Sequence, residues 1–274
     1  MKFHKQSILP VILCCMVILC GGIFYYLNSH DDSLETQSVV KSTASAIPTT
    51  STPAPTPEDL SRYSLSEEAI YSYFQGPKAW KSRKIWSGSW ADMMFEGNSF
   101  GNFGCGLCCM ANIYSTLSNY VCSPVDMYHF AVENSSYAPS YGYGAISWPA
   151  IASTLEICGI ESELHRKPDD YSTFQQDIAH AYATIVLISS NDSDVYWQDT
   201  GGHYVTIWNY DETSNTIFLT DSGSPEHNRS RIDLKIIYDS LKTSSSFQYL
   251  TANNYVEEQN QWQWNQISEE WVAP

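Results

Sequence analysis

The sequence predicts an α+β fold in which a helical subdomain packs on an antiparallel sheet. Helical patterns come first, led by an apolar run at 107–117 that is followed by two segments with Ser and Pro at their starts. Strand patterns come afterwards, and two of them are joined by a short polar loop that is typical of a hairpin. Helices followed by strands indicate α+β architecture, whereas alternation would indicate a parallel sheet.

Each expected element depends on a local signal. The run at 107–117 is apolar nearly all round, which predicts a buried helix. Ser123 followed by Pro124 is typical of an N-cap and a first helical turn. Strands are expected where β-branched or alternating residues occur between turn signals. The expected helices cover 65–74, 107–117, 124–133, 147–159 and 171–182, an irregular segment covers 75–103, and the expected strands cover 160–165, 184–189, 203–210, 216–221 and 247–251.

Residues 1–30 predict a signal anchor. Lys2 and Lys5 precede an uncharged run at 8–27, and about 20 helical residues span a hydrocarbon core of about 30 Å. The apolar run shows no small-residue cleavage site, which favours an uncleaved anchor over a signal peptide. A lipoprotein signal around Cys20 is an alternative that the bulky Leu19 disfavours. Because positive charge stays inside, we expect a single-pass cell-membrane protein with an extracytoplasmic domain.

The rest of the chain divides into a linker and one domain. Residues 31–57 are rich in Ser, Thr and Pro, which predicts a disordered stalk. Residues 58–274 are enough for one domain with a sizeable core. This domain has 11 Lys and Arg against 27 Asp and Glu, so it carries the whole formal charge of -16. Its acidic surface repels phosphate backbones, which argues against nucleic acid as a partner.

The cysteines of the domain predict at least one thiol that is free or paired between chains, because their number is odd. A zinc site from Cys105 and Cys108 would need a second close pair, and the remaining spacing does not offer one. We therefore expect neither metal nor another cofactor. Core packing is the expected role of Cys108 and Cys109. The five cysteines are Cys105, Cys108, Cys109, Cys122 and Cys158.

Cys105 has the surroundings of a catalytic nucleophile. A thiolate attacks carbonyl groups and a thiol scarcely does, so such a cysteine needs a lowered pKa. Gly104 and Gly106 permit a sharp turn into the helix, whose first N–H groups and dipole favour a negative sulfur. The same N–H groups can hold an oxyanion. The competing interpretation is a buried structural cysteine.

His203 is the expected base, because it stands at the start of a convincing strand after Gly201-Gly202. Asp221 ends the next strand, so an antiparallel hairpin brings it beside His203, where a carboxylate can orient the imidazole. A turn residue is the other interpretation of Asp221. The other histidines considered are expected to be structural within helices, namely His129 and His180, or solvated in polar surroundings, namely His165 and His227.

Three blocks of sequence together resemble a known family. They read Phe103-Gly-Cys-Gly-Leu-Cys-Cys-Met-Ala-Asn-Ile-Tyr, Gly202-His-Tyr-Val-Thr-Ile-Trp-Asn-Tyr-Asp and Ile217-Phe-Leu-Thr-Asp. They resemble the bacteriocin-processing (double-glycine) peptidase-like family of bacterial cysteine peptidases, over about 85–252. The resemblance implies a papain-like fold, with Cys105 as nucleophile, His203 as general base and Asp221 as the orienting residue. It also suggests a surface protein of a Gram-positive bacterium.

The chain departs from the family's pattern in three places. The family commonly has proline where this chain has Leu107 and Ser222, and neither proline performs chemistry. The glutamine that usually serves the oxyanion hole has no counterpart between Gln75 and Cys105. The expected donors are therefore Asn98 or Asn102, together with the backbone of Gly106, because the role requires only an N–H group.

These observations predict a membrane-anchored thiol hydrolase that cleaves peptide or protein substrates. One alternative is a hydrolase of cell-wall peptide crosslinks, which would make the cell wall a partner. An alternative of another class is a catalytically silent binding module or adhesin, which the missing glutamine motivates. Trp262, Trp264 and Trp271 would then form a ligand-binding stripe, although packing against the domain explains them better.

Overall fold

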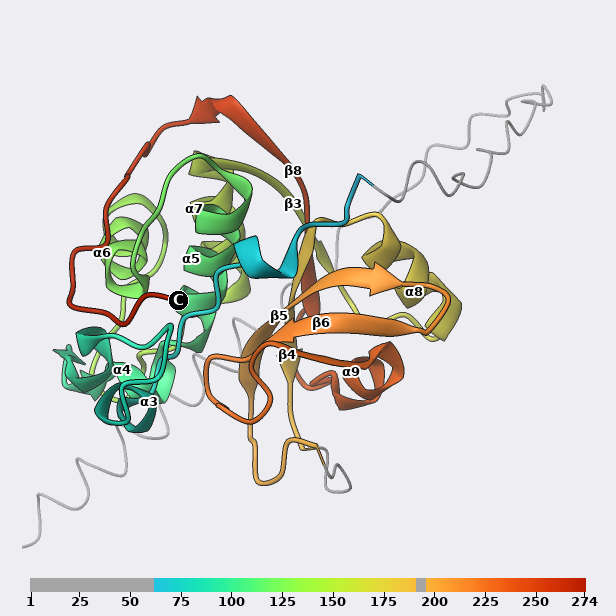
Figure 1. Cartoon of the computed structure of the whole chain (residues 1–274), viewed down its shortest axis with the longest axis horizontal. Helices are drawn as coiled ribbons and strands as arrows, with labels where there is room; N and C mark the ends of the chain where they lie inside the picture. The colour runs from blue at the N-terminus through green and yellow to red at the C-terminus, as the bar shows by residue number, and fades with distance from the viewer. Residues whose placement is uncertain (1–61, 191–195) are drawn as a thin grey trace, which may run out of the picture. The chain divides into compact units, whose positions relative to one another are not determined.

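The computed structural model describes residues 62–190 and 196–274, shown in colour in Figure 1. The predicted signal anchor at 1–30 and the predicted stalk at 31–57 lie outside the described residues. Within the described residues, no helix combines the length and the apolar composition needed to cross a membrane.

Most of the helices lie in the first half of the described chain, and two more lie between successive strands of the sheet. The longest of them, α5, has Cys105 as its first residue. The α-helices are α3 (Pro77–Lys81), α4 (Phe100–Phe103), α5 (Cys105–Leu117), α6 (Pro124–Asn134), α7 (Trp148–Ile157), α8 (Tyr171–Ala179) and α9 (Leu234–Ser240), and the 3-10 turns are η1 (Glu67–Ala69) and η2 (Ser89–Asp92).

A six-stranded sheet forms the centre of the domain, with strand order β3-β8-β4-β5-β6-β7. Every neighbouring pair in it is antiparallel. Strands β1 and β2 form a separate antiparallel pair. This arrangement confirms the predicted α+β class. The strands are β1 (Met94–Phe95), β2 (Asn98–Ser99), β3 (Cys158–His165), β4 (Ala183–Ile188), β5 (His203–Asp211), β6 (Thr216–Thr220), β7 (Ser230–Asp233) and β8 (Tyr249–Asn260).

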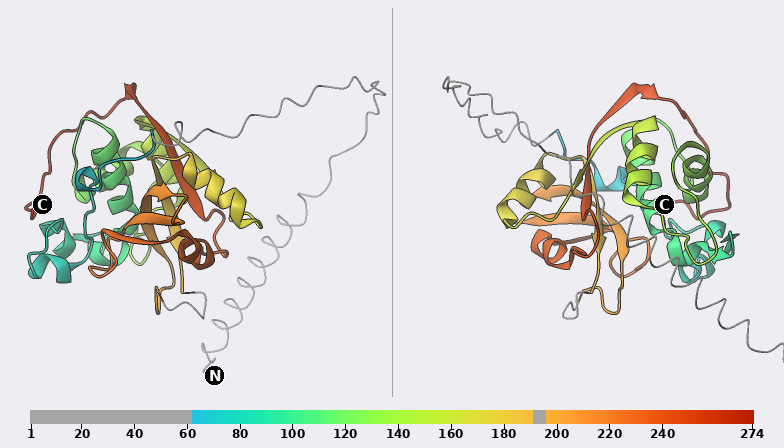
Figure 2. Two further views of the ribbon diagram at one scale, coloured as in Figure 1. Left: turned by 45° about the vertical axis from the view of Figure 1, so that its right-hand side comes forward. Right: turned by 180° about the vertical axis from the view of Figure 1, so that it is seen from behind.

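The sheet separates two apolar cores. Along β4, Ile185 belongs to the core shared with α5, α6 and α7, whereas its neighbour Val186 belongs to the core beneath α8 and α9. Tyr204 and Val205 on β5 divide in the same way. Alternate side chains of a strand point to opposite faces, so helices cover the sheet on both sides. Figures 1 and 2 show this arrangement from three directions.

Helix α6 begins at the residue that the sequence predicts, and the predicted N-cap and proline explain its start. Ser123 is the N-cap, and its hydroxyl accepts a hydrogen bond from the backbone N–H of Asp126 at 3.0 Å. The Asp126 carboxylate accepts one in return from the backbone N–H of Ser123 at 2.7 Å. This reciprocal capping satisfies two helix-terminal donors, and Pro124 lacks an N–H that would need a partner.

The predicted helix at 65–74 is wrong. Only the short turn η1 forms there, and the chain that follows passes beside α5, where the N–H of Tyr71 binds the Thr116 side chain at 3.0 Å. Its backbone donors are used by distant groups: the N–H of Tyr73 binds the Asn112 side chain at 2.9 Å, and the N–H of Gln75 binds the carbonyl of Ser222 at 2.9 Å. Tertiary contacts have therefore replaced the local helical hydrogen bonds, and they carry Gln75 to the centre of the domain.

The end of the chain packs against the domain, which confirms the packing interpretation of the tryptophans. Trp262 stacks on Phe130 of α6 with ring centroids 4.3 Å apart. Trp271 forms a β-bridge with Gly88 and contacts the ring of Tyr73. Strand β8 is also longer than predicted, and sequence patterns missed β7 and α9.

Candidate active site

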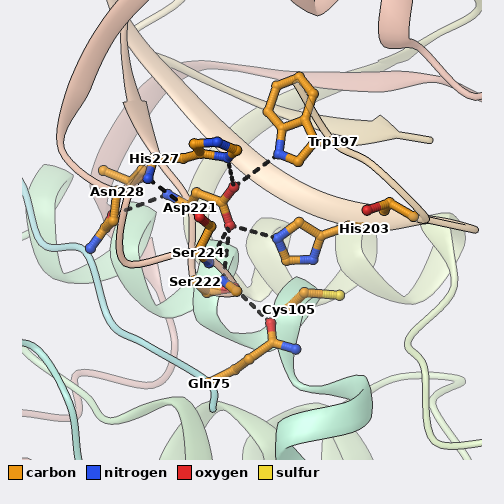
Figure 3. Close-up of polar contacts among 12 residues, drawn as sticks. Gln75, Cys105, Trp197, His203, Asp221, Ser222, Ser224, His227 and Asn228 are labelled. Atoms are coloured by element: carbon orange, nitrogen blue, oxygen red, sulfur yellow. Dashed lines mark hydrogen bonds and ion pairs between the residues drawn. The ribbon is translucent and has the colours of Figure 1, made fainter. Parts of the chain in front are cut away.

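Three elements bring the predicted catalytic residues together. Cys105 begins α5, His203 begins β5, and Asp221 directly follows β6. Nε2 of His203 lies 2.8 Å from Oδ1 of Asp221, and Figure 3 shows the other ring nitrogen turned toward the sulfur of Cys105. Cys105 is 8% exposed and Asp221 is fully buried. The site is thus a Cys-His-Asp array with the imidazole in the middle.

The pairing of β5 and β6 explains the position of the carboxylate. Thr206 pairs with Thr220, so in continued register His203 lies near Gly223 and diagonal to Asp221 on the same face. On the other side, the N-terminus of α5 packs closely against β5. A Cβ on Gly106 would lie 2.6 Å from Ile146 and 3.2 Å from Tyr204, so a glycine is needed for this approach.

Asp221 is surrounded by donors. Besides His203, its carboxylate accepts hydrogen bonds from the indole of Trp197 at 2.9 Å and from the backbone N–H groups of Gly223 and Ser224 at 2.9 and 3.1 Å. Burial by itself raises the pKa of Asp221, but the charge and hydrogen bond of His203, together with the Trp197 donor, outweigh it and hold the pKa well below its usual range. Asp221 is therefore an anion at neutral pH.

Opposing effects of burial and of neighbouring charge also favour the thiolate form of Cys105 and the protonated form of His203. Burial raises the pKa of Cys105, but hydrogen bonding and charge from His203, with the backbone N–H groups of Tyr204 and Gly106, bring that pKa below its ordinary value. Burial lowers the pKa of His203, and Asp221 and Cys105 more than offset this, raising it to about 10. A thiolate beside a protonated imidazole is the activated form of a cysteine nucleophile.

The other cysteines of the described chain have a different character. All five cysteines there are free and buried. Burial raises the pKa of Cys108, Cys109, Cys122 and Cys158, so among the cysteines of the described chain Cys105 alone has a lowered thiol pKa. Among the described residues, no group of His, Cys, Asp or Glu has an arrangement that would hold a metal ion.

Gln75 also lies at the site, and sequence patterns missed it. Its Nε2 donates to the carbonyl of Gly101 at 2.9 Å, and its Oε1 accepts from the hydroxyl of Ser222 at 2.7 Å. These contacts fix the orientation of the amide, which Figure 3 shows beside Cys105. Within the part of the chain that the structure describes, Nε2 makes no other hydrogen bond, so its second hydrogen is left for an oxyanion. No spacing signal marks Gln75, because an extended segment rather than the loop before α5 delivers it.

The three oxyanion-hole candidates from the sequence differ in position. Gly106 follows Cys105 directly, and its backbone N–H favours the thiolate form of that sulfur. Asn98 instead donates to the carbonyl of Ser140 at 2.8 Å and accepts from the N–H of Gly142 at 2.9 Å, which joins the β1–β2 turn to the 140–142 segment. Asn102 is exposed on α4. Of the three, only Gly106 contacts Cys105 among the described residues.

Two histidines that were expected to be solvated are instead partly buried. Nδ1 of His227 lies 3.6 Å from Oδ2 of Asp221, in the turn after β6. The ring of His165 stacks on Tyr249 with centroids 4.8 Å apart, and its Nε2 lies 3.0 Å from the Thr251 hydroxyl. Polar neighbours in the sequence suggested solvation, but the tertiary fold places aromatic rings against both histidines.

Gly223 gives a direct test of how tightly His203 is held. A Cβ at this position would lie 3.0 Å from Cε1 and 3.1 Å from Nε2 of His203. We expect Gly223→Ala to displace the ring and to slow alkylation of Cys105 by roughly tenfold, since small misplacements are costly in pre-organised sites. Gly201→Ala is the matched control, because nothing lies within 4 Å of its added Cβ. Equal rates in the two variants would contradict the close packing.

Comparison with known proteins adds no family to these observations. No protein-family model matches the sequence. No curated protein sequence matches it either. The functional argument therefore depends on the geometry of the site.

Proposed function

We propose that this chain is a cysteine peptidase, a thiol hydrolase that acts on peptide bonds. Cys105 is the nucleophile, His203 the general base and acid, and Asp221 the residue that orients His203. The observation that carries the proposal is the hydrogen bond of 2.8 Å between the buried Asp221 and Nε2 of His203, with the opposite edge of the imidazole facing Cys105. A purely structural cysteine has no need of both partners.

The chemistry follows from the positions of these groups. The Cys105 thiolate attacks the carbonyl carbon of the scissile bond, and the charge moves to the carbonyl oxygen. The backbone N–H of Gly106 and the free hydrogen of Gln75 Nε2 stabilise this oxyanion. His203 then gives its proton to the leaving amine. Water, activated by the neutral imidazole, hydrolyses the acyl-enzyme and restores the thiolate.

The arrangement of elements favours a papain-like fold for the domain. In such a fold, a buried helix presents the nucleophile at its N-terminus and packs on an antiparallel sheet that carries the histidine and the orienting residue. Helix α5, strand β5 and the end of β6 have these roles here. The resemblance of three sequence blocks to bacteriocin-processing peptidases supports the same proposal, and the apolar run at 8–27 supports an extracytoplasmic domain anchored in the membrane.

The position of Gln75 is relevant to the alternative of a catalytically silent binding module. That alternative was motivated by the absence of an oxyanion-hole glutamine near Cys105 in the sequence. Gln75 has a buried, oriented amide beside Cys105, which removes the motivation. The tryptophans of the tail pack on the domain and give a binding stripe no support.

Alkylation by iodoacetamide across pH tests the proposal. In the full-length protein, we expect Cys105 to react at a pH below that of an ordinary thiol, about 8.5, because its pKa is lowered mainly through His203. His203→Ala should shift the rise in rate to higher pH, and Cys105→Ala should abolish the fast reaction. Peptide hydrolysis should fall as the pH rises through about 10, where His203 loses the proton it gives to the amine.

Slow labelling that is shared with the other cysteines and indifferent to His203→Ala would refute the nucleophile assignment. A cleavage screen with a mixture of quenched fluorescent peptides then tests turnover. Cleavage by the wild type that is absent in Cys105→Ala is the expected result.

A further inference from the structure

Asp221 has a histidine at each edge of its carboxylate. Oδ1 lies 2.8 Å from Nε2 of His203, and Oδ2 lies 3.6 Å from Nδ1 of His227. Trp197 donates to Oδ2 as well, at 2.9 Å. Figure 3 shows the two imidazoles on different sides of the carboxylate. One buried anion therefore connects the reactive histidine to a second one.

The ring of His227 is fixed by contacts that do not involve Asp221. It stacks on Tyr196 with centroids 4.1 Å apart and an interplanar angle of 22°. It meets the Trp197 ring edge-on, with centroids 6.0 Å apart. The backbone N–H of His227 donates to the carbonyl of Ser224 at 3.2 Å. These contacts hold Nδ1 toward Oδ2 independently of Asp221.

Nδ1 of His227 is buried and makes no other hydrogen bond among the described residues. A buried polar atom without a partner costs free energy, and a shift of a few tenths of an ångström toward Oδ2 would complete a hydrogen bond. The side chain as a whole remains 25% exposed. The titratable groups that contact it are Asp221 and Tyr196, which lies in the segment before β5.

We propose that His227 is a positioning residue that donates from Nδ1 to Oδ2 of Asp221 and so holds the carboxylate in line with His203. Trp197 already donates to Oδ2, and a second donor at this oxygen further restricts rotation of the carboxylate away from the imidazolium, which keeps the thiolate form of Cys105 favoured. The inference rests on the proposed function, because the orientation of Asp221 has an effect only if Cys105 and His203 are a reactive pair.

Two substitutions distinguish hydrogen-bond donation by His227 from the packing of its ring. His227→Gln replaces the imidazole by a side chain with an N–H donor but no aromatic ring. His227→Phe keeps a ring for Tyr196 but has no donor. His165→Phe is the matched control, because His165 also stacks on a tyrosine and lies 3.9 Å from an aspartate, Asp177, without contact to the site. Each full-length variant is treated with iodoacetamide across pH, and circular dichroism checks its fold.

We expect His227→Phe to slow alkylation of Cys105 at neutral pH by roughly tenfold, the equivalent of one hydrogen bond to a charged group. The midpoint of the rate profile should also move to higher pH, because a weaker hold on the His203 imidazolium favours the neutral thiol. His227→Gln should retain most of the rate, and His165→Phe should match the wild type. A merely structural ring would give the reverse order, with Phe better tolerated than Gln.

Unchanged profiles in both His227 variants, or Phe outperforming Gln, would overturn the inference while leaving the proposed function intact. Slow alkylation of the wild type that is insensitive to His203→Ala would refute the proposed function itself. The two failures are thus distinguishable in one set of measurements.

Discussion

Asp221→Asn is expected to slow alkylation of Cys105 by at least roughly 100-fold, although the change replaces only one oxygen by an amide nitrogen. The carboxylate accepts hydrogen bonds from His203, the indole of Trp197, and the N–H groups of Gly223 and Ser224, and Nδ1 of His227 lies 3.6 Å from its Oδ2. An asparagine side chain has one acceptor oxygen and one NH₂ group. Its NH₂ group must therefore face at least one of these donors, with which it cannot form a hydrogen bond. The side chain will rotate or shift, and His203 loses its orientation and its counter-charge.

The same substitution should also destabilise the fold, by about 2 kcal/mol, because a buried donor such as the Trp197 N–H loses its acceptor. Asp126→Asn separates the two effects. Asp126 is buried and accepts from the N-cap of α6, so its change should lower the melting temperature and leave the alkylation rate unchanged. A wild-type rate in Asp221→Asn that still depends on His203 would show that no orienting carboxylate is needed.

The sequence predicted those parts of the fold whose signals are local. Helix α6 begins at the predicted residue because Ser123, Pro124 and Asp126 satisfy its first turn among themselves. Strand β5 begins at His203 as predicted, because alternate β-branched and aromatic residues serve the two faces of the sheet. The catalytic candidates follow from these elements, since a residue at the start of a helix or at the end of a hairpin strand is placed by its own segment.

The sequence failed where distant groups determine the backbone. The segment at 65–74 has a helical pattern, but hydrogen bonds from Tyr73 to Asn112 and from Gln75 to Ser222 hold it extended. Local propensity is a weak determinant that such contacts override. Gln75 follows this segment directly, and no local signal showed that the extended backbone would bring it beside Cys105. His227 was missed for a related reason, since its aromatic neighbour Tyr196 lies 31 positions earlier in the chain.

Replacement of Gln75 is the second change with a large expected effect, and it should separate two reactions of the same cysteine. The free hydrogen of its Nε2 is placed to stabilise an oxyanion, while the amide has no contact with His203 or Asp221 among the described residues. Alkylation by iodoacetamide is a displacement at saturated carbon that forms no oxyanion. We therefore expect Gln75→Ala to alkylate at the wild-type rate, whereas kcat for peptide hydrolysis falls by roughly 100- to 1,000-fold.

Two control variants make this result specific. Asn98→Ala removes the donor that the sequence suggested, and it should leave kcat unchanged because Asn98 is used by the carbonyl of Ser140. Ser222→Ala removes only the hydroxyl that holds the Gln75 oxygen, so a loss smaller than that of Gln75→Ala is expected. The backbone hydrogen bond between Gln75 and Ser222 survives in every variant, which limits structural damage. A parallel loss of alkylation and hydrolysis in Gln75→Ala would mean that the amide supports the fold of the site rather than the charge on the substrate.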